Sequence, residues 1–346
     1  MTAHIQQVCA GNAPLFFAEQ GGDVELVERD GHSYYRIRNY QTLPPFFMSV
    51  VSGFDHWLFV SSTGGLTCGR RSPDMALFPY TTDDKIHDAS ETAGPYSCVL
   101  VESDSETFVW EPFSRRASLY RVERNLYKSV EGDRLVFEEL NEDLGLCFSY
   151  AWGTSERLGF VRRVNLRNDS NKNLKIRVID GLRNILPWGV DRQMQANMST
   201  LVDAYKQSES IPGVCAGVYS LSSIVSDRAE PSEALCASVA WSIGLEQPGV
   251  VLSEEQLTHF MAGQALVPEA LKVGQRGAFF VFDQFELSDA QHQEWFVVAD
   301  VSQSAAALSG LLGEIKNGMT GETISAELNA GTERLRQRVG AADGFQ

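Results

Sequence analysis

Residues 160–166, Phe160-Val161-Arg162-Arg163-Val164-Asn165-Leu166, exchange apolar and polar side chains with a period close to two. Residues 174–178, Leu174-Lys175-Ile176-Arg177-Val178, repeat the pattern. This period is typical of β-strands that bury one face. The polar run from residue 168 to residue 173 between them has the composition of a turn. The two stretches therefore predict two strands joined as a hairpin.

Comparable runs recur along most of the chain, separated by Gly, Asn, Asp and Pro. They lie at residues 57–60, 98–101, 107–110, 118–122, 134–137, 146–150, 237–241, 278–282 and 295–298. Because few of these runs alternate with helices, they favour antiparallel sheets over βαβ units. A dozen or more strands exceed the roughly ten that one open sheet usually holds. We therefore expect two large stacked sheets.

Helical periodicity is confined to three regions. In residues 191–205 one helical face would carry Met194, Met198, Leu201 and Tyr205. Ser253 has the character of an N-cap for a short helix through Phe260. Residues 304–316 and 320–339, rich in Ala, Leu, Glu and Arg, predict two C-terminal helices. This change in composition predicts a domain boundary near residue 302.

Composition excludes several classes of protein. The chain has 346 residues, 43% of them hydrophobic, and a net charge of −16 without a Lys/Arg-rich run. Nucleic acid and anionic membranes are therefore poor partners. The N-terminus lacks a basic segment followed by an apolar one, and no apolar run reaches the ~18 residues of a membrane span. We expect a cytoplasmic protein, or a fragment whose targeting signal lies elsewhere.

The six cysteines lie far apart and form no C-x-x-C or Cys/His pattern of a zinc site. We expect reduced thiols, mostly in the core, and no metal site.

The most unusual polar stretch runs from Ser61 to Pro95. Gly64, Gly69 and Arg70 partly imitate a phosphate-binding loop, but its Lys is absent and Pro73 obstructs the helix that should follow. The stretch therefore does not predict a nucleotide site.

The same stretch holds the candidate substrate-binding residues. Arginine offers a rigid fork of donors, and carboxylates accept hydrogen bonds from hydroxyl groups, so these side chains suit sugar hydroxyls or a phosphate. The candidates are Arg70, Arg71, Asp74, Tyr80, Asp83, Asp84, Lys85 and His87. The alternative is a surface loop cross-linked by its own salt bridges.

Catalytic residues are not identified by residue type alone. Glycoside hydrolysis needs two facing carboxylates, and no pair stands out among so many. The adjacent pairs Glu138-Glu139 and Glu254-Glu255 would point to opposite faces of a strand and are expected to be solvated. His56 and His87 are expected to be structural. Most tryptophans lie in apolar runs, which places them in the core.

Three parts of the chain together resemble a known family. They are residues 56–70 (HWLFVSSTGGLTCGR) with 77–87 (LFPYTTDDKIH), 123–128 (ERNLYK) with 137–146 (FEELNEDLGL), and 179–190 (IDGLRNILPWGV). These stretches resemble the N-terminal region of cellobiose-phosphorylase-like proteins, glycoside hydrolase family 94, formerly glycosyltransferase family 36. The resemblance spans most of residues 30–340.

The resemblance implies a mainly β fold, a galactose-mutarotase-like β-supersandwich with a C-terminal helical linker. Residues 1–302 would form the sandwich, and residues 303–346 would lead towards a catalytic (α/α)6 barrel. In that family the general acid and the inorganic phosphate site belong to the barrel, so no catalytic residue is carried over to this chain. No cofactor is implied, since phosphate is a co-substrate of the whole family enzyme.

The leading hypothesis is a carbohydrate-associated domain of a glycoside phosphorylase or glycosyltransferase-like enzyme acting on β-glucosides, non-catalytic alone. Its partners would be an oligosaccharide or sugar phosphate, the barrel in cis and a second copy in a homodimer. Residues 61–87 would then lend a loop to the rim of an active site. One alternative is a mutarotase-like epimerase or hydrolase in which His56 or His87 acts with a carboxylate. The other is an assembly or dimerisation module.

Overall fold

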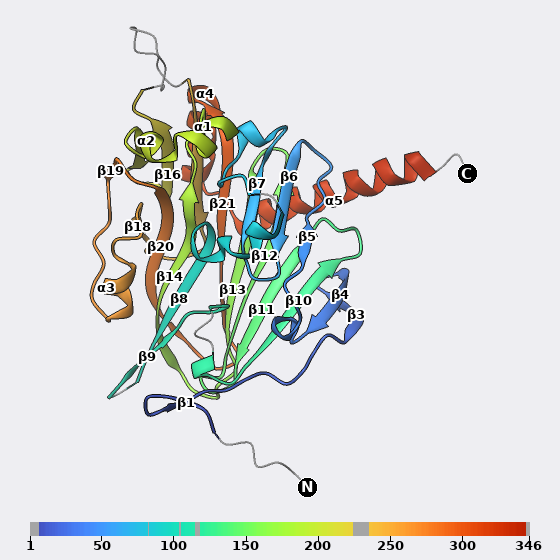
Figure 1. The fold of residues 1–346 in the computed structure, drawn as a ribbon, viewed down its shortest axis with the longest axis vertical. Helices are drawn as coiled ribbons and strands as arrows, with labels where there is room; N and C mark the ends of the chain where they lie inside the picture. The colour runs from blue at the N-terminus through green and yellow to red at the C-terminus, as the bar shows by residue number, and fades with distance from the viewer. Residues whose placement is uncertain (1–6, 82, 104, 115–117, 224–234, 344–346) are drawn as a thin grey trace.

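Two antiparallel sheets make up most of the fold. The computed structural model describes residues 7–81, 83–103, 105–114, 118–223 and 235–343, without the side chains of residues 83 and 84. The larger sheet has eleven strands in the order β19-β15-β16-β17-β21-β13-β12-β11-β10-β4-β3, and the smaller has five in the order β18-β20-β14-β8-β9 (Figure 1). The sheets β5-β6-β7 and β1-β2 are smaller still. The prediction of a mainly β-supersandwich is confirmed.

The eleven-stranded sheet comprises β3 (Val24–Arg29), β4 (His32–Arg38), β10 (Val122–Ser129), β11 (Leu135–Asn141), β12 (Leu146–Ser155), β13 (Gly159–Asn168), β15 (Lys206–Ser210), β16 (Ala216–Leu221), β17 (Cys236–Ile243), β19 (Leu271–Val273) and β21 (His292–Ser304). The five-stranded sheet comprises β8 (Gly94–Glu102), β9 (Thr107–Trp110), β14 (Leu174–Ile185), β18 (Gly249–Val251) and β20 (Gly277–Leu287). The others are β1 (Cys9–Ala10), β2 (Ala13–Pro14), β5 (Phe47–Ser49), β6 (His56–Ser61) and β7 (Leu66–Arg70). Short 3-10 turns are η1 (Tyr40–Thr42), η2 (Pro73–Met75), η3 (Asp83–His87) and η4 (Ala89–Glu91).

The main core lies between the two large sheets, and strand β12 shows how it forms. Its large side chains point inward, namely Leu146, Phe148, Tyr150 and Trp152, each at most 3% exposed. Its alternate positions carry only Cys147, Ser149, Ala151 and Gly153. Because successive side chains of a strand point to opposite faces, the large residues fill the core and the small ones lie on the outer face of the sheet.

The stretch that predicts the fold forms two strands, but the predicted hairpin is wrong. β13 pairs with β12 and β21, whereas β14 pairs with β8 and β20 of the other sheet. The chain crosses from one sheet to the other between β13 and β14. Buried Asn168 stabilises this connection, because its Nδ2 donates to the carbonyls of Lys172 (2.7 Å) and Leu287 (2.8 Å). Both strands turn apolar side chains towards the same core. The alternation of apolar and polar residues is therefore the same whether the two strands pair within one sheet or face each other across the core from different sheets.

Three local predictions need correction. The expected helix over residues 191–205 divides into α1 (Arg192–Asn197) and α2 (Ser199–Asp203), and Leu201 is exposed. Ser253 is no N-cap, since its hydroxyl donates to Glu269 and α3 (Leu257–Met261) begins later. Of the run at 118–122, only the last residue is in a strand.

The thiols are free as predicted, but only three are buried. These three are Cys68, Cys98 and Cys147, whereas Cys9 is exposed.

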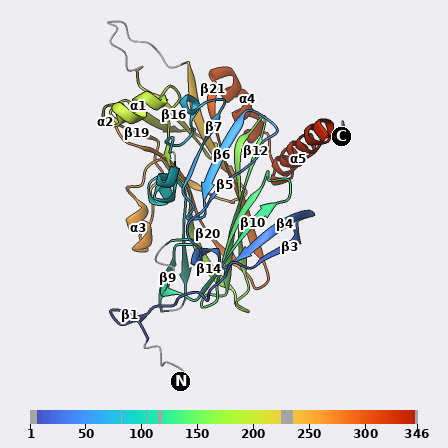
Figure 2. The ribbon, with the colours of Figure 1, turned by 45° about the vertical axis from the view of Figure 1, so that its right-hand side comes forward.

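The C-terminal helices form as predicted. They are α4 (Ala305–Lys316) and α5 (Gly321–Asp343), and the hydroxyls of Ser304 and Thr320 accept hydrogen bonds from their first turns. Both helices pack on the outer face of the larger sheet, where Ile324 is fully buried, and the end of α5 extends away from the sandwich (Figure 1, Figure 2). No helix in the described ranges is long and apolar enough to cross a membrane.

Candidate functional site

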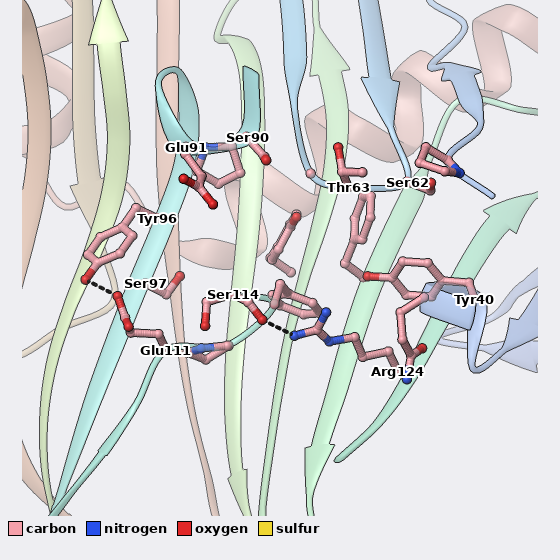
Figure 3. A pocket seen from close by; sticks show the side chains of 18 of the residues that line it. Tyr40, Ser62, Thr63, Ser90, Glu91, Tyr96, Ser97, Glu111, Ser114 and Arg124 are labelled. Atoms are coloured by element: carbon pink, nitrogen blue, oxygen red, sulfur yellow. Dashed lines mark hydrogen bonds between the residues drawn. The ribbon is translucent and has the colours of Figure 1, made fainter. Parts of the chain in front are cut away.

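A cavity of about 660 Å³ opens where β9 ends and leaves the first residues of β8 uncovered. Its walls come from η1, the loop after β6, the segment after β9 and the inner faces of β10, β11 and β12 (Figure 3). Residues of both large sheets therefore meet in one hollow. Hollows in which converging polar groups lie next to apolar surface are the usual place for a small ligand.

Aromatic rings form one wall of the cavity. The rings of Phe137 and Tyr150 stack with centroids 5.1 Å apart, and Phe113 meets Tyr150 edge-on at 5.2 Å. Phe113 has a φ of 63°, a left-handed conformation that large side chains rarely adopt. Its backbone N–H donates to Glu139 at 2.7 Å, which holds this strained residue in place. Phe137 and Tyr150 are only 1% and 3% exposed, so Phe113 is the ring of this wall that offers apolar surface to a ligand.

Charged and hydroxyl groups line the rest of the cavity. Tyr96 donates its hydroxyl hydrogen to Glu111 at 2.9 Å (Figure 3). The guanidinium of Arg183 lies 4.1 Å from the centre of the Tyr96 ring and pairs with Glu254 at 3.3 Å. Arg124 enters from β10 and donates to the carbonyl of Ser114 at 2.8 Å. The cavity thus presents donors and acceptors next to aromatic rings.

Burial changes the acidity of two groups in this cavity. Partial burial raises the pKa of Glu254, whose side chain is still 42% exposed, and Arg183 offsets part of that rise by favouring the carboxylate. Burial also raises the pKa of Tyr96, which keeps its hydroxyl protonated as a hydrogen-bond donor. Glu254 therefore takes up a proton at higher pH than a solvated glutamate would.

A fully buried ion pair stands behind the cavity wall. Arg162 of β13 and Asp180 of β14 are both 0% exposed and lie 2.7 Å apart, so the pair links the two large sheets. Asp180 also accepts from Ser97 (2.6 Å) and from Trp295 (2.8 Å). The Arg162 guanidinium lies 4.5 Å from the centre of the Tyr150 ring. Ser97 and Tyr150 line the cavity, so this network fixes part of its shape.

Arg70, the first of the predicted binding residues, is an internal cross-link. Its guanidinium donates to Asp300 (2.8 and 2.9 Å), Asp55 (2.9 Å) and the Glu156 carbonyl (2.8 Å). Arg71 also donates to Asp55, at 3.1 Å. Both arginines form ion pairs, but their partners Asp55 and Asp300 lie outside residues 61–95, so these pairs tie the loop to the sandwich instead of cross-linking it internally.

The other predicted residues lie outside the cavity lining where they are described. Asp74 accepts from the backbone N–H of Arg192, Tyr80 contacts Trp57 edge-on, and Lys85 is exposed. The Nδ1 of His87 lies 2.7 Å from the hydroxyl of Ser61. The side chains of Asp83 and Asp84 lie outside the described part of the chain. Within residues 61–87, Ser62, Thr63 and Gly64 line the cavity. Ligand binding by the eight candidates stays a prediction.

The second histidine, His56, is a core residue. Its side chain is 8% exposed and meets the ring of Phe160 edge-on at 5.1 Å. Burial and the neighbouring positive charge of Arg70 lower the pKa of His56 to about 3. The unfolded chain binds a proton near pH 6.5 and the folded chain does not, so stability falls as pH falls below that value.

We therefore expect His56 to contribute about 2 kcal/mol to the loss of unfolding free energy between pH 7 and pH 5. His56→Phe should remove this part of the pH dependence, because phenylalanine fits the aromatic surroundings and does not titrate. Urea titrations at both pH values measure it, with the same substitution at exposed His259 as control. An unchanged pH dependence in His56→Phe would show that another group is responsible.

Sequence reasoning missed most of the cavity. Arg124 and Arg183 lie inside the stretches that carry the family resemblance, but no local pattern marked them as cavity residues. The expectation that Glu138 and Glu139 are solvated is wrong, since they are 8% and 0% exposed. Glu139 accepts from Trp110, Phe113 and Arg124, which replace water as its partners.

Comparisons with known proteins identify no family. No family model matches the chain, and no curated protein matches its sequence. A bacterial glucoamylase complexed with acarbose is similar in fold, with a TM-score of 0.44, 9% identity, and coverage of 84% of this chain and 38% of that one. A structure described as a kojibiose phosphorylase from the human microbiome has a TM-score of 0.33 and 9% identity, and the match covers 85% of this chain and 31% of that one. A structure described as an aldose 1-epimerase from Klebsiella pneumoniae has a TM-score of 0.32 and 7% identity, and the match covers 86% of this chain and 92% of that one.

This chain therefore spans less than two fifths of the first two proteins. TM-scores below 0.5 decide neither family nor activity. The resemblance to glycoside hydrolase family 94 stays a prediction.

Proposed function

We propose that this chain is a carbohydrate-binding domain that takes a neutral mono- or disaccharide into the cavity. One observation carries the proposal: the ring of Phe113, packed against Phe137 and Tyr150, lines the same cavity as polar groups that include Glu111 and Arg183. Aromatic rings pack against the apolar faces of sugars, while carboxylates and guanidinium groups exchange hydrogen bonds with hydroxyls. The three carboxylates and two arginines of the lining nearly balance, which suits an uncharged ligand.

In its finer form, the proposal is the N-terminal domain of a phosphorylase-like enzyme of β-glucosides, non-catalytic by itself. The sequence resemblance supports this assignment. The position of the two candidate histidines counts against the epimerase or hydrolase alternative, because His56 is enclosed by aromatic rings and His87 bonds to Ser61. Neither lines the cavity.

The first test is saccharide binding. We expect cellobiose to bind the wild-type chain, and Glu111→Gln or Arg183→Met to raise its Kd about tenfold or more, since each removes a charged hydrogen-bonding group. Isothermal titration calorimetry gives the Kd values. Glu123→Gln is the matched control, because Glu123 pairs with exposed Arg38 and does not line the cavity.

The proposal would be refuted if cellobiose and glucose failed to bind, or if the control weakened binding as much as the cavity variants. Activity is tested separately by following glucose 1-phosphate release from cellobiose with phosphate and by polarimetry of α-glucose. We expect no turnover above the uncatalysed rate. Turnover that Glu111→Gln abolishes would replace the binding domain with the enzyme alternative.

A further inference from the structure

A second hollow, a trough of about 810 Å³, crosses the opposite face of the larger sheet. It has a simple origin in the sequence of β12, whose outward residues Ser149, Ala151 and Gly153 are small. Longer side chains flank them on both sides, among them Arg163 on the adjacent strand β13 and Tyr127 on β10, which lies beyond β11. Helix α5 closes one end through residues that include Leu328 and Asn329.

The trough is richer in positive charge than the rest of this acidic chain. Five arginines line it, with three carboxylates, whereas the whole chain carries −16. The arginines are Arg29, Arg36, Arg134, Arg163 and Arg167. Two of them have replaceable partners: Arg163 pairs with Asp30 and Glu294, and Arg167 with exposed Asp169. The Arg163–Glu294 pair is half-buried, but pairs with an exposed partner, such as Arg163–Asp30 and Arg167–Asp169, contribute little stability, so an anionic ligand can take the place of Asp30 or Asp169.

Groups that recognise hydroxyls lie between the arginines. Ser149, Asn165, Ser325 and Asn329 offer hydroxyl and amide donors and acceptors along the trough. Arg134 reaches Asn329 at 2.6 Å, which joins the sheet to the helical end. An elongated ligand with acidic groups and hydroxyls would satisfy both kinds of residue.

We propose that this trough binds an acidic oligosaccharide, with sugar carboxylates paired to Arg163 and Arg167. Arginine forks match carboxylates with two parallel hydrogen bonds, which favours a saccharide of uronic acid type over a neutral one. This site lies on the face of β10, β11 and β12 opposite to the cavity, and the inference does not depend on the function proposed for that cavity.

The test uses trigalacturonate as the acidic probe and its fully methyl-esterified form as the matched neutral probe. We expect calorimetry to show binding of the acid alone, with a Kd that rises as NaCl increases from 50 to 500 mM. The double variant Arg163→Gln, Arg167→Gln should raise that Kd at least tenfold while the melting temperature stays within a few degrees. Arg121→Gln with Arg276→Gln removes the same charge from exposed sites outside the trough and should leave the Kd unchanged.

Three results would overturn the proposal. They are no binding of trigalacturonate, equal binding of the ester, and equal weakening by both double variants. If hexaglutamate or inorganic sulfate bound more tightly than trigalacturonate, and if that binding required Arg163 and Arg167, the trough would be reassigned to an acidic peptide or a small anion. Glu111→Gln, which alters the cavity, should not change trigalacturonate affinity, so failure here is distinguishable from failure of the proposed function.

Discussion

Asp180→Ala is expected to lower the free energy of unfolding by about 3–5 kcal/mol, the usual cost of leaving a buried charge without its partner. The side chains of Asp180 and Arg162 are both 0% exposed, and Asp180 is bonded to Arg162, Ser97 and Trp295. Removing the carboxylate leaves a guanidinium in the core between the two sheets, together with two donors that have lost their acceptor. Urea titration of both proteins at pH 7 measures the difference.

The double variant Arg162→Met, Asp180→Leu separates charge pairing from packing. Because it removes both charges, we expect it to be more stable than Asp180→Ala. A double-mutant cycle with the single variants Arg162→Met and Asp180→Leu then gives the coupling energy. The exposed pair Arg121–Asp143 is the reference, and we expect its coupling to be much weaker because solvent screens it. If Asp180→Ala costs no more than Asp143→Ala, the buried pair does not stabilise this fold.

The strands could be predicted from sequence because burial of one face leaves a period of two in the chain. The pairing of those strands could not. A five-residue connection between β13 and β14 suits a hairpin within one sheet, yet here it crosses between sheets. The choice between a hairpin and a connection between sheets depends on pairing with strands far away in the sequence, such as β21 for β13 and β20 for β14. The local sequence pattern contains no information about those strands.

The side chains of the candidate site also depend on distant residues that the local sequence does not show. Residues 61–87 stood out as a polar loop, and Ser62, Thr63 and Gly64 do line the cavity. The charges of that loop looked available for a ligand, but Arg70 is bonded to Asp300, 230 positions away. Residue type shows what a group can bind, and only the fold determines whether a partner within the chain already binds it.

Glu139 is the residue through which stability and the cavity are most closely joined. Its carboxylate is 0% exposed and accepts three hydrogen bonds of 2.7 Å, from the Trp110 indole, the Phe113 backbone and the Arg124 guanidinium. Each donor would be buried or half-buried without an acceptor if the carboxylate were removed. Phe113, held at a φ of 63°, would also lose the contact that stabilises its strained backbone.

We therefore expect Glu139→Ala to cost about 3–5 kcal/mol of unfolding free energy and to weaken cellobiose binding, because Phe113 and Arg124 both line the cavity. Glu139→Gln preserves the size of the side chain but places an amide group near three donors, so it should recover only part of the stability. Urea titration and calorimetry on the same samples, at a temperature where each variant is folded, separate the two effects. Loss of stability with unchanged cellobiose affinity would show that Glu139 supports the sandwich without positioning the cavity wall.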